Sequence, residues 1–412
     1  MTKMPWRVFL FFYFTGSAAS TISYILLGYF FGRKWQRFEA LLGSLAIYLI
    51  LAAIALMVVG VMFRRLLICP RPFVGNPRGT TMPAIRRILV AVRALDAKSL
   101  PAVLKAAQIA RACAAQIELY HGLDRPVYAD LDGLEERSLL ELERELKQRA
   151  VRRLEDIADR LRQHSIKVSV CADWDFPAHE AIVRRALSIE ADLIVAAGHA
   201  TRHRWPSLMR LTDWELVRLS PLPLLLAKNP RPYRHPVVLA AVDPTHAFAK
   251  PLQLDQQILQ MGRAVSLALR GSLHAVHAYA RVPSGSVPEA GFTPALIKRI
   301  EKDAERAASR GFDRVLRSSR ITRAHRYLIA RDPVNGIAEA ARRSRSAIVV
   351  MGAVSRSGFK RLLIGNTAER ILDELRCDVL VLKPRKFRNR VPSAARGPRL
   401  MGSMSTDSVG FY

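Results

Sequence analysis

The sequence predicts an α/β protein made of two tandem, doubly wound domains, each on a five-stranded parallel sheet, after two transmembrane helices. Short β-branched runs alternate with longer helical patterns, which is typical of buried parallel sheets with helical crossovers. This pattern occurs twice along the chain, at a nearly constant offset. Two long uncharged runs precede the first occurrence and predict the membrane segment.

The amino-acid composition excludes several classes of protein. The 412 residues include 64 Lys and Arg against 35 acids, which gives a net charge of +29, and half of them are hydrophobic. This balance excludes a disordered or collagen-like chain. The four cysteines form no CxxC pair, so we exclude a disulfide scaffold and a zinc finger and expect a reduced, cytosol-facing compartment.

The first part of the chain, residues 1–66, is predicted to be a two-helix transmembrane anchor. Residues 8–32 and 40–63 carry no charge, and each run exceeds the roughly 20 helical residues that cross a bilayer core. A signal peptide fits less well, because a second apolar run follows the first and no cleavage site leads into a soluble domain. Residues 64–87 contain six arginines and no acid, which places the following domains in the cytosol. The expected location is therefore the cytoplasmic (inner) membrane, with a multi-pass anchor.

This hairpin resembles the last two transmembrane helices of the DedA (SNARE-associated, VTT) membrane family. The likeness rests on residues 11–16, on LGYFFG at 27–32 and on the second apolar helix. The family's upstream half, with its re-entrant region, has no counterpart here, so we expect an anchor rather than a transporter. A basic linker, residues 67–83, follows the hairpin and is expected to contact inner-membrane lipid with it.

Nucleic acid is the weaker candidate partner for the basic charge. Phosphate backbones attract Lys and Arg, but no recognition helix, aromatic RNA-binding strand or zinc motif accompanies the charge. We expect no specific nucleic-acid binding.

Two domains follow, residues 84–230 and 231–385. The strands predicted in the first are 88–92, 117–120, 168–171, 193–197 and 222–227, and those in the second are 237–242, 273–279, 326–330, 348–351 and 379–382. Residues 386–412 lack periodicity and contain Arg, Ser, Gly and Pro, so we expect a disordered basic tail.

Four pairs of landmarks indicate that the two domains are copies of one unit. One pair, Thr212 and Asn366, opens a helix in each copy, and each residue precedes a Glu by three positions, as in a capping box. The pairs are Arg93 with Asp243 (150 residues apart), Gly198 with Gly352 (154), Thr212 with Asn366 (154) and Lys228 with Lys383 (155).

Several motifs in the two copies indicate a family resemblance. The second copy contains VVMG at 349–352, GNTAE at 365–369 and RCDVLVLKP at 376–384, and the first contains TDWELVR at 212–218. Together they resemble the tandem universal stress protein E type. The resemblance implies Rossmann-like domains, an intramolecular pseudo-dimer of the two copies, and a ligand beyond the carboxyl ends of the strands. It also implies a non-enzymatic ligand-binding or signalling module in the stress response.

ATP or a related nucleotide is the ligand expected in the second copy. Nucleotide-binding members of the family carry Gly-x-x-Gly, nine residues, then Gly and Ser or Thr. Glycine lets backbone N–H groups approach phosphate, and a helix N-terminus adds donors. Here the outer glycines keep their spacing, Ser355 replaces the second Gly, and Asn366 replaces the hydroxyl residue. The candidate site residues are Asp243, Gly352, Ser355, Gly358, Gly365, Asn366 and Thr367.

The first copy departs further from that motif. Arg93 replaces the acid that corresponds to Asp243. The positions that would form an open phosphate-binding loop are occupied by His203, Trp205 and Pro206. We expect this copy to be structural and filled by apolar side chains.

Catalysis and metal binding have weaker support, and we predict neither. His199 and His203 are four residues apart but lack a third ligand, and of His274 and His277 one is expected at the surface. Asp173 to Asp175 is expected to form a turn. Two alternatives remain open: a nucleotide hydrolase, which the absence of a Walker Lys-Ser/Thr disfavours, and a regulatory domain attached to a DedA-like membrane transporter.

Overall fold

The computed structural model describes residues 84–97, 100–123, 127–129, 136–198, 212–244, 252–280, 294–353, 366–397 and 400–402. All of them belong to one compact unit, Thr80–Tyr412. The predicted anchor, residues 1–66, and the linker, residues 67–83, lie outside the described residues. Within the described ranges, no helix combines the length and the apolar character that a membrane span requires.

The first copy contributes five parallel strands in the order β4-β2-β1-β5-β6. The strands are β1 (Arg87–Ala91), β2 (Gln116–Gly122), β4 (Val168–Asp173), β5 (Leu193–Ala197) and β6 (Leu224–Ala227). The helices between them are α3 (Pro101–Cys113), α4 (Glu136–Arg162), α5 (Ala178–Ser188) and α6 (Thr212–Leu219).

The second copy repeats this arrangement, in the order β11-β10-β7-β8-β9. Its strands are β7 (Val237–Ala241), β8 (Ser272–Tyr279), β9 (Arg326–Ala330), β10 (Ile348–Gly352) and β11 (Asp378–Leu382). Its helices are α7 (Leu252–Ala268), α8 (Pro294–Leu316), α9 (Pro333–Arg343) and α10 (Asn366–Glu374), and a 3₁₀ turn, η1 (Arg323–His325), precedes β9.

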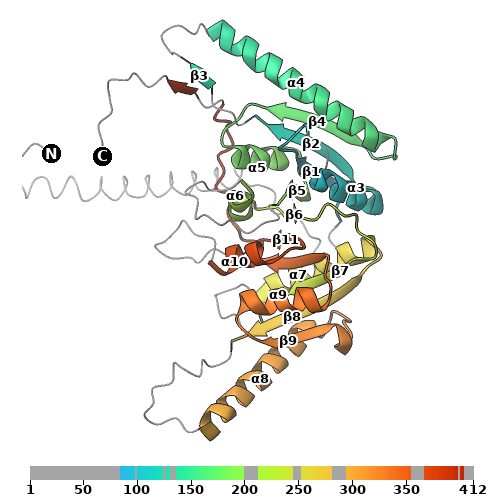
Figure 1. The fold of residues 1–412 in the computed structure, drawn as a ribbon, viewed down its shortest axis with the longest axis vertical. Coiled ribbons are helices and arrows are strands. Elements are labelled where there is room, and N and C mark those ends of the chain that lie inside the picture. The colour runs from blue at the N-terminus through green and yellow to red at the C-terminus, as the bar shows by residue number, and fades with distance from the viewer. Residues whose placement is uncertain are drawn as a thin grey trace, which may run out of the picture. The chain divides into compact units, whose positions relative to one another are not determined.

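The two copies join through their last strands. β6 and β11 run antiparallel, with Leu225 opposite Leu380, so the two sheets form one continuous sheet of ten strands. Figure 1 shows the labelled strands of this sheet in the same order, from β4 near the top to β9 near the bottom.

Helices cover both faces of the sheet, and this explains why the strands are apolar throughout. Along β1, Ile88 and Val90 face a core formed with α3, α4, α7 and α8. The alternate residues, Leu89 and Ala91, face a second core formed with α5, α6, α9 and α10. Successive side chains of a strand point to opposite faces, so a sheet buried on both sides needs apolar residues at every position.

Part of the segment expected to be a disordered tail, residues 386–397 and 400–402, makes defined contacts with the first copy. Phe176 N donates a hydrogen bond to Gly397 O (3.0 Å), and Arg396 N donates one to Asp175 Oδ1 (2.9 Å). Val391 is buried in the core that contains α5, α6, α9 and α10. A short strand, β12 (Leu400–Gly402), pairs with β3 (Val127–Ala129) of the first copy. The composition of these residues gave no signal because the contacts that order them are with a distant segment of the chain.

Candidate functional site

The carboxyl ends of β7 and β10 form the topological switch point of the second copy. The two strands pair in parallel, with Ala240 opposite Val350. The helices that follow them, α7 and α10, pack on opposite faces of the sheet. Crevices at such points are where open α/β sheets bind ligands. Asp243 follows β7 and Gly352 ends β10, so the structure brings these two predicted site residues to one edge.

Asp243 is half-buried, and its backbone N donates a hydrogen bond to Asp255 Oδ1 (3.1 Å). Asp255 lies in the first turn of α7 and is buried. A carboxylate is favourable at a helix N-terminus, and here it also fixes the loop after β7. Sequence reasoning missed Asp255, although an acid in the first turn of a predicted helix is a readable signal.

Gly352 has a packing role that the sequence did not reveal. A Cβ at this position would lie 2.7 Å from Leu254 Cδ2 and 3.4 Å from Ile258 Cδ1. The missing side chain therefore lets α7 approach β10. Leu254 occupies the space in the Cβ direction of Gly352, and the interpretation that the backbone of Gly352 can approach phosphate stays a prediction.

The remaining candidates are placed only in part. Ser355, Gly358 and Gly365 lie outside the described residues. Asn366 and Thr367 open α10, where the capping pattern predicts a helix start, but only their backbone is described.

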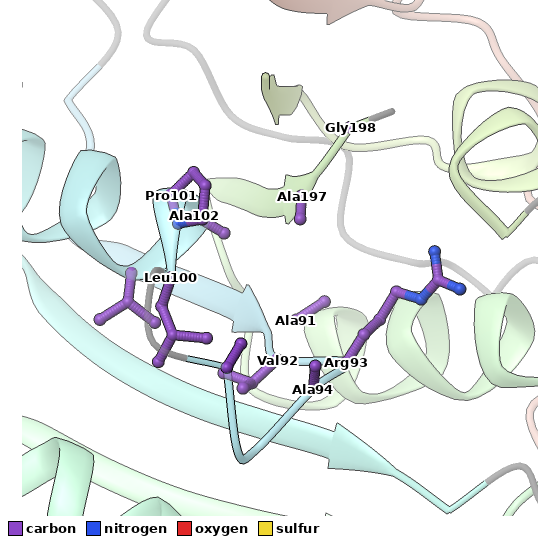
Figure 2. A pocket seen from close by; sticks show the side chains of 11 residues that line it. Ala91, Val92, Arg93, Ala94, Leu100, Pro101, Ala102, Ala197 and Gly198 are labelled. Carbon is purple, nitrogen blue, oxygen red and sulfur yellow. The ribbon is translucent and has the colours of Figure 1, made fainter. Parts of the chain in front are cut away.

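The equivalent edge of the first copy has an open pocket, contrary to the expectation that apolar side chains fill it. Its volume is about 380 Å³, and it lies where β1 and β5 pair in parallel. Arg93, the counterpart of Asp243, is the one charged residue among the described residues that line it, and Figure 2 shows this side chain extending from the loop after β1. The lining residues are Ala91, Val92, Arg93, Ala94, Ala97, Leu100, Pro101, Ala102, Val103, Ala197 and Gly198.

A buried polar cluster at the junction of the copies was also missed. Asp378, at the start of β11, is fully buried and accepts hydrogen bonds from Lys228 N (2.8 Å), Asn229 N (2.9 Å) and Tyr233 OH (2.6 Å). Lys105 Nζ of α3 lies 3.3 Å from Asp378 Oδ2. Burial lowers the pKa of Lys105, and the charge of Asp378 opposes that shift. The sequence offered one signal for this cluster, because Asp378 is an acid at the start of an otherwise apolar strand.

The histidines on β8 are both buried, so the expectation that one lies at the surface was wrong. The ring of His274 stacks on that of His325, with centroids 4.0 Å apart. Burial, with a smaller contribution from His325, lowers the pKa of His274 to about 4. His277 Nδ1 lies 3.3 Å from Val242 O.

Other reactive side chains are held in structural roles. Asp175 pairs with Arg184. Burial is the main cause that raises the pKa of Cys171 and of Cys377 to about 12, so neither thiol is an activated nucleophile. Within the described ranges, no three His, Cys, Asp or Glu residues are grouped to hold a metal ion. His199 and His203 lie outside those ranges.

One comparison decides the family. The model of the universal stress protein family matches residues 84–228 and 253–383, one segment in each copy. The chain belongs to the universal stress protein family. The two copies are tandem universal stress protein domains, which confirms this part of the resemblance.

Among curated proteins, the chain is 27% identical over 237 residues to universal stress protein E of Escherichia coli (strain K12), covering 55% of this chain and 71% of that relative. The same values hold for universal stress protein E of Salmonella typhi.

Two solved structures have a similar fold. A functionally unknown protein from Pseudomonas aeruginosa PAO1 is similar at a TM-score of 0.56 and 26% identity, covering 74% of this chain and 95% of that chain. A universal stress protein from Archaeoglobus fulgidus DSM 4304 reaches a TM-score of 0.51 at 15% identity, covering 72% and 98% of the two chains. At this identity the second likeness shows the fold alone.

Proposed function

We propose that this chain is a membrane-tethered, non-enzymatic ligand-binding module of the stress response, and that its second copy binds ATP or a related nucleotide. The observation that carries the proposal is the edge formed by β7 and β10, where Asp243 and Gly352 follow neighbouring parallel strands. The proposed site residues are Asp243, Gly352, Ser355, Gly358, Gly365, Asn366 and Thr367.

Each part of this edge suits a different part of a nucleotide. The carboxylate of Asp243 would accept hydrogen bonds from ribose hydroxyls or a base amine. Backbone N–H groups at the start of α10 would donate to phosphate, with the positive end of the helix dipole. Because Leu254 fills the open side of Gly352, we assign Gly352 to positioning the loop that follows it.

The first-copy pocket supports a second candidate ligand. Its volume, about 380 Å³, falls within the range of small-molecule sites. An apolar lining with one arginine favours a small anionic compound with an apolar body. This ligand would differ from a nucleotide, because the acid that would face ribose in the second copy is replaced by Arg93.

The tether rests on the two uncharged runs, residues 8–32 and 40–63, and on the arginines after them. Basic residues beside a bilayer are attracted to anionic lipid by about 1 kcal/mol each. The domains would then work at the cytoplasmic face of the inner membrane. Nucleotide hydrolysis and regulation of a DedA-like transporter are the alternatives.

Titration calorimetry of the full chain with ATP tests the nucleotide site. Gly365→Val places a branched side chain where backbone must approach phosphate and is expected to abolish binding. Asp243→Ala is expected to weaken binding by about tenfold, the loss of one charge-assisted hydrogen bond. Arg93→Ala, at the equivalent position of the first copy, is the matched control and should leave affinity unchanged.

Two results would contradict the proposal. Loss of ATP binding in Arg93→Ala but not in Asp243→Ala would move the nucleotide to the first copy. Release of phosphate from ATP by the purified chain, lost in Gly365→Val, would favour the hydrolase. Mass spectrometry of ligand that co-purifies with the chain, and is lost in Arg93→Ala, tests the second candidate.

A further inference from the structure

The segment that connects the two copies is fixed along its backbone. Lys228 N and Asn229 N donate to Asp378. Tyr233 N donates to Gln108 Oε1 (2.9 Å), and Gln108 Nε2 donates to Tyr233 O (3.1 Å). Lys105 Nζ donates to the carbonyl of Arg231. The interdomain connection is thus held in one conformation by hydrogen bonds to side chains of both copies.

Beside this segment lies a second pocket, of about 440 Å³. We call it the linker pocket, after the segment between the two copies and not after the basic linker at residues 67–83. Among the described residues that line it, three are cationic and none is acidic. Lys105 is already paired with Asp378, so the uncompensated charge comes from Arg231 and Arg234, which are exposed. Neither guanidinium forms an ion pair with a carboxylate in the part of the chain that the structure describes. The lining residues are Lys105, Asn229, Arg231, Pro232, Tyr233, Arg234, Pro236 and Ala347.

The linker pocket is separate from the proposed nucleotide edge. Pro236 and Ala347 immediately precede β7 and β10, whereas Asp243 and Gly352 lie at the carboxyl ends of the same strands. The two locations are at opposite ends of one strand pair. A ligand of the linker pocket would therefore not compete for the switch point.

We propose that the linker pocket binds a small molecule that carries a diphosphate group. Guanidinium groups bind phosphate oxygens in pairs, through parallel N–H donors, and Arg231 and Arg234 supply two such groups from one short segment. Because hydrogen bonds already fix the backbone, little ordering of the segment opposes binding. Since Lys105 reaches the pocket from the first copy and Ala347 from the second, the ligand would contact both copies at their junction.

Calorimetric titration of the full chain with sodium pyrophosphate tests this inference. We expect saturable one-to-one binding that weakens as salt increases. Arg231→Ala with Arg234→Ala should lower affinity by at least about tenfold. Replacing both arginines by lysine keeps the charge but loses the planar donors, so the pyrophosphate affinity of that variant should lie between those of the double alanine variant and the unmodified chain.

A matched control removes the same charge elsewhere. Arg152 and Arg160 are exposed on α4, at the far edge of the first copy, and Arg152→Ala with Arg160→Ala should leave pyrophosphate affinity unchanged. Thermal unfolding of each variant confirms that it is folded.

Three results would overturn the inference. An equal loss in the control pair would mean that pyrophosphate responds to overall charge. No saturable binding by the unmodified chain at millimolar pyrophosphate would mean that the pocket is not a site. Loss of pyrophosphate binding in Gly365→Val, but not in the Arg231 and Arg234 variant, would place the anion at the nucleotide edge.

Discussion

Lys105 of the first copy and Asp378 of the second form a buried ion pair, with 3.3 Å between Nζ and Oδ2 and side-chain exposures of 2% and 0%. The ammonium of Lys105 also lies 3.6 Å from the centre of the Tyr233 ring, and Tyr233 OH donates to the same carboxylate oxygen. The pair therefore connects α3, the interdomain segment and β11 in one network.

Removing one member of this pair should destabilise the junction. Asp378→Ala leaves the Lys105 charge buried and two backbone N–H groups without their acceptor, and we expect a loss of about 3–5 kcal/mol in the free energy of unfolding, measured in urea. Glu143→Ala breaks a partly exposed pair with Lys147 on α4 and should cost less than about 1 kcal/mol. Similar losses in the two variants would contradict a structural role for the buried pair.

Stability should depend on the protonation of His274. Its pKa is lowered from 6.5 to about 4 in the folded chain, so between these pH values the unfolded chain binds a proton that the folded chain does not. The free energy of unfolding should therefore fall as pH decreases from 6.5 to 4.

The variant His274→Gln measures this contribution. Urea unfolding at several pH values should show a shallower decline for the variant than for the unmodified chain, with a difference on the order of 1–3 kcal/mol across the interval. His164→Gln, at an exposed position, is the control. Parallel pH profiles for His274→Gln and the unmodified chain would disprove the assignment.

Gly352→Ala should destabilise the second copy through packing. The new Cβ would meet Leu254, and overpacking of a core costs about 1–3 kcal/mol. Gly122→Ala is the matched control, since its Cβ would have its nearest neighbour at 3.7 Å. Leu254→Ala in the same chain should relieve the clash. If Gly352→Ala unfolds at the same urea concentration as the unmodified chain, the packing role is wrong.

The tail should become sensitive to protease when its buried anchor is changed. Val391→Asp places a charge in the core that contains α5, α6, α9 and α10, which should release residues 386–397. Trypsin should then cut after arginines of this segment faster than in the unmodified chain. Ala394→Asp, at an exposed position, should leave the cleavage rate unchanged, and equal rates in the two variants would argue against the anchor.

The proposed tether makes a direct prediction about fractionation. The full chain should sediment with membranes and resist extraction with sodium carbonate, because two apolar helices would be embedded in the bilayer. Deletion of residues 1–66 should move the remaining domains to the supernatant. Recovery of the full chain in the soluble fraction would refute the anchor.

Sequence periodicity predicted the sheet well because burial on both faces constrains every strand residue. The predicted bounds of β5 and β9 agree with the structure, 193–197 and 326–330. Local patterns also predicted where α6 and α10 begin.

Local sequence patterns could not predict the features that depend on contacts between distant segments. Asp378 meets Lys105 across 273 residues of sequence, and the tail is ordered by Asp175 and Phe176 of the first copy. The pocket beside Arg93 depends on how α3 leaves space at the end of β1. The hydrophobic periodicity of the sequence does not predict these contacts between distant segments.

The antiparallel pairing of β6 with β11 has a consequence for how the two halves diverge. Covalent linkage gives the two edges a high effective concentration for each other, so the pairing persists on dilution and needs no second molecule. Neither half must then match an identical copy of itself. Substitutions at one switch point, such as Arg93 in place of an acid, need not be repeated at the other, and a single gene product can present two chemically different sites in fixed stoichiometry.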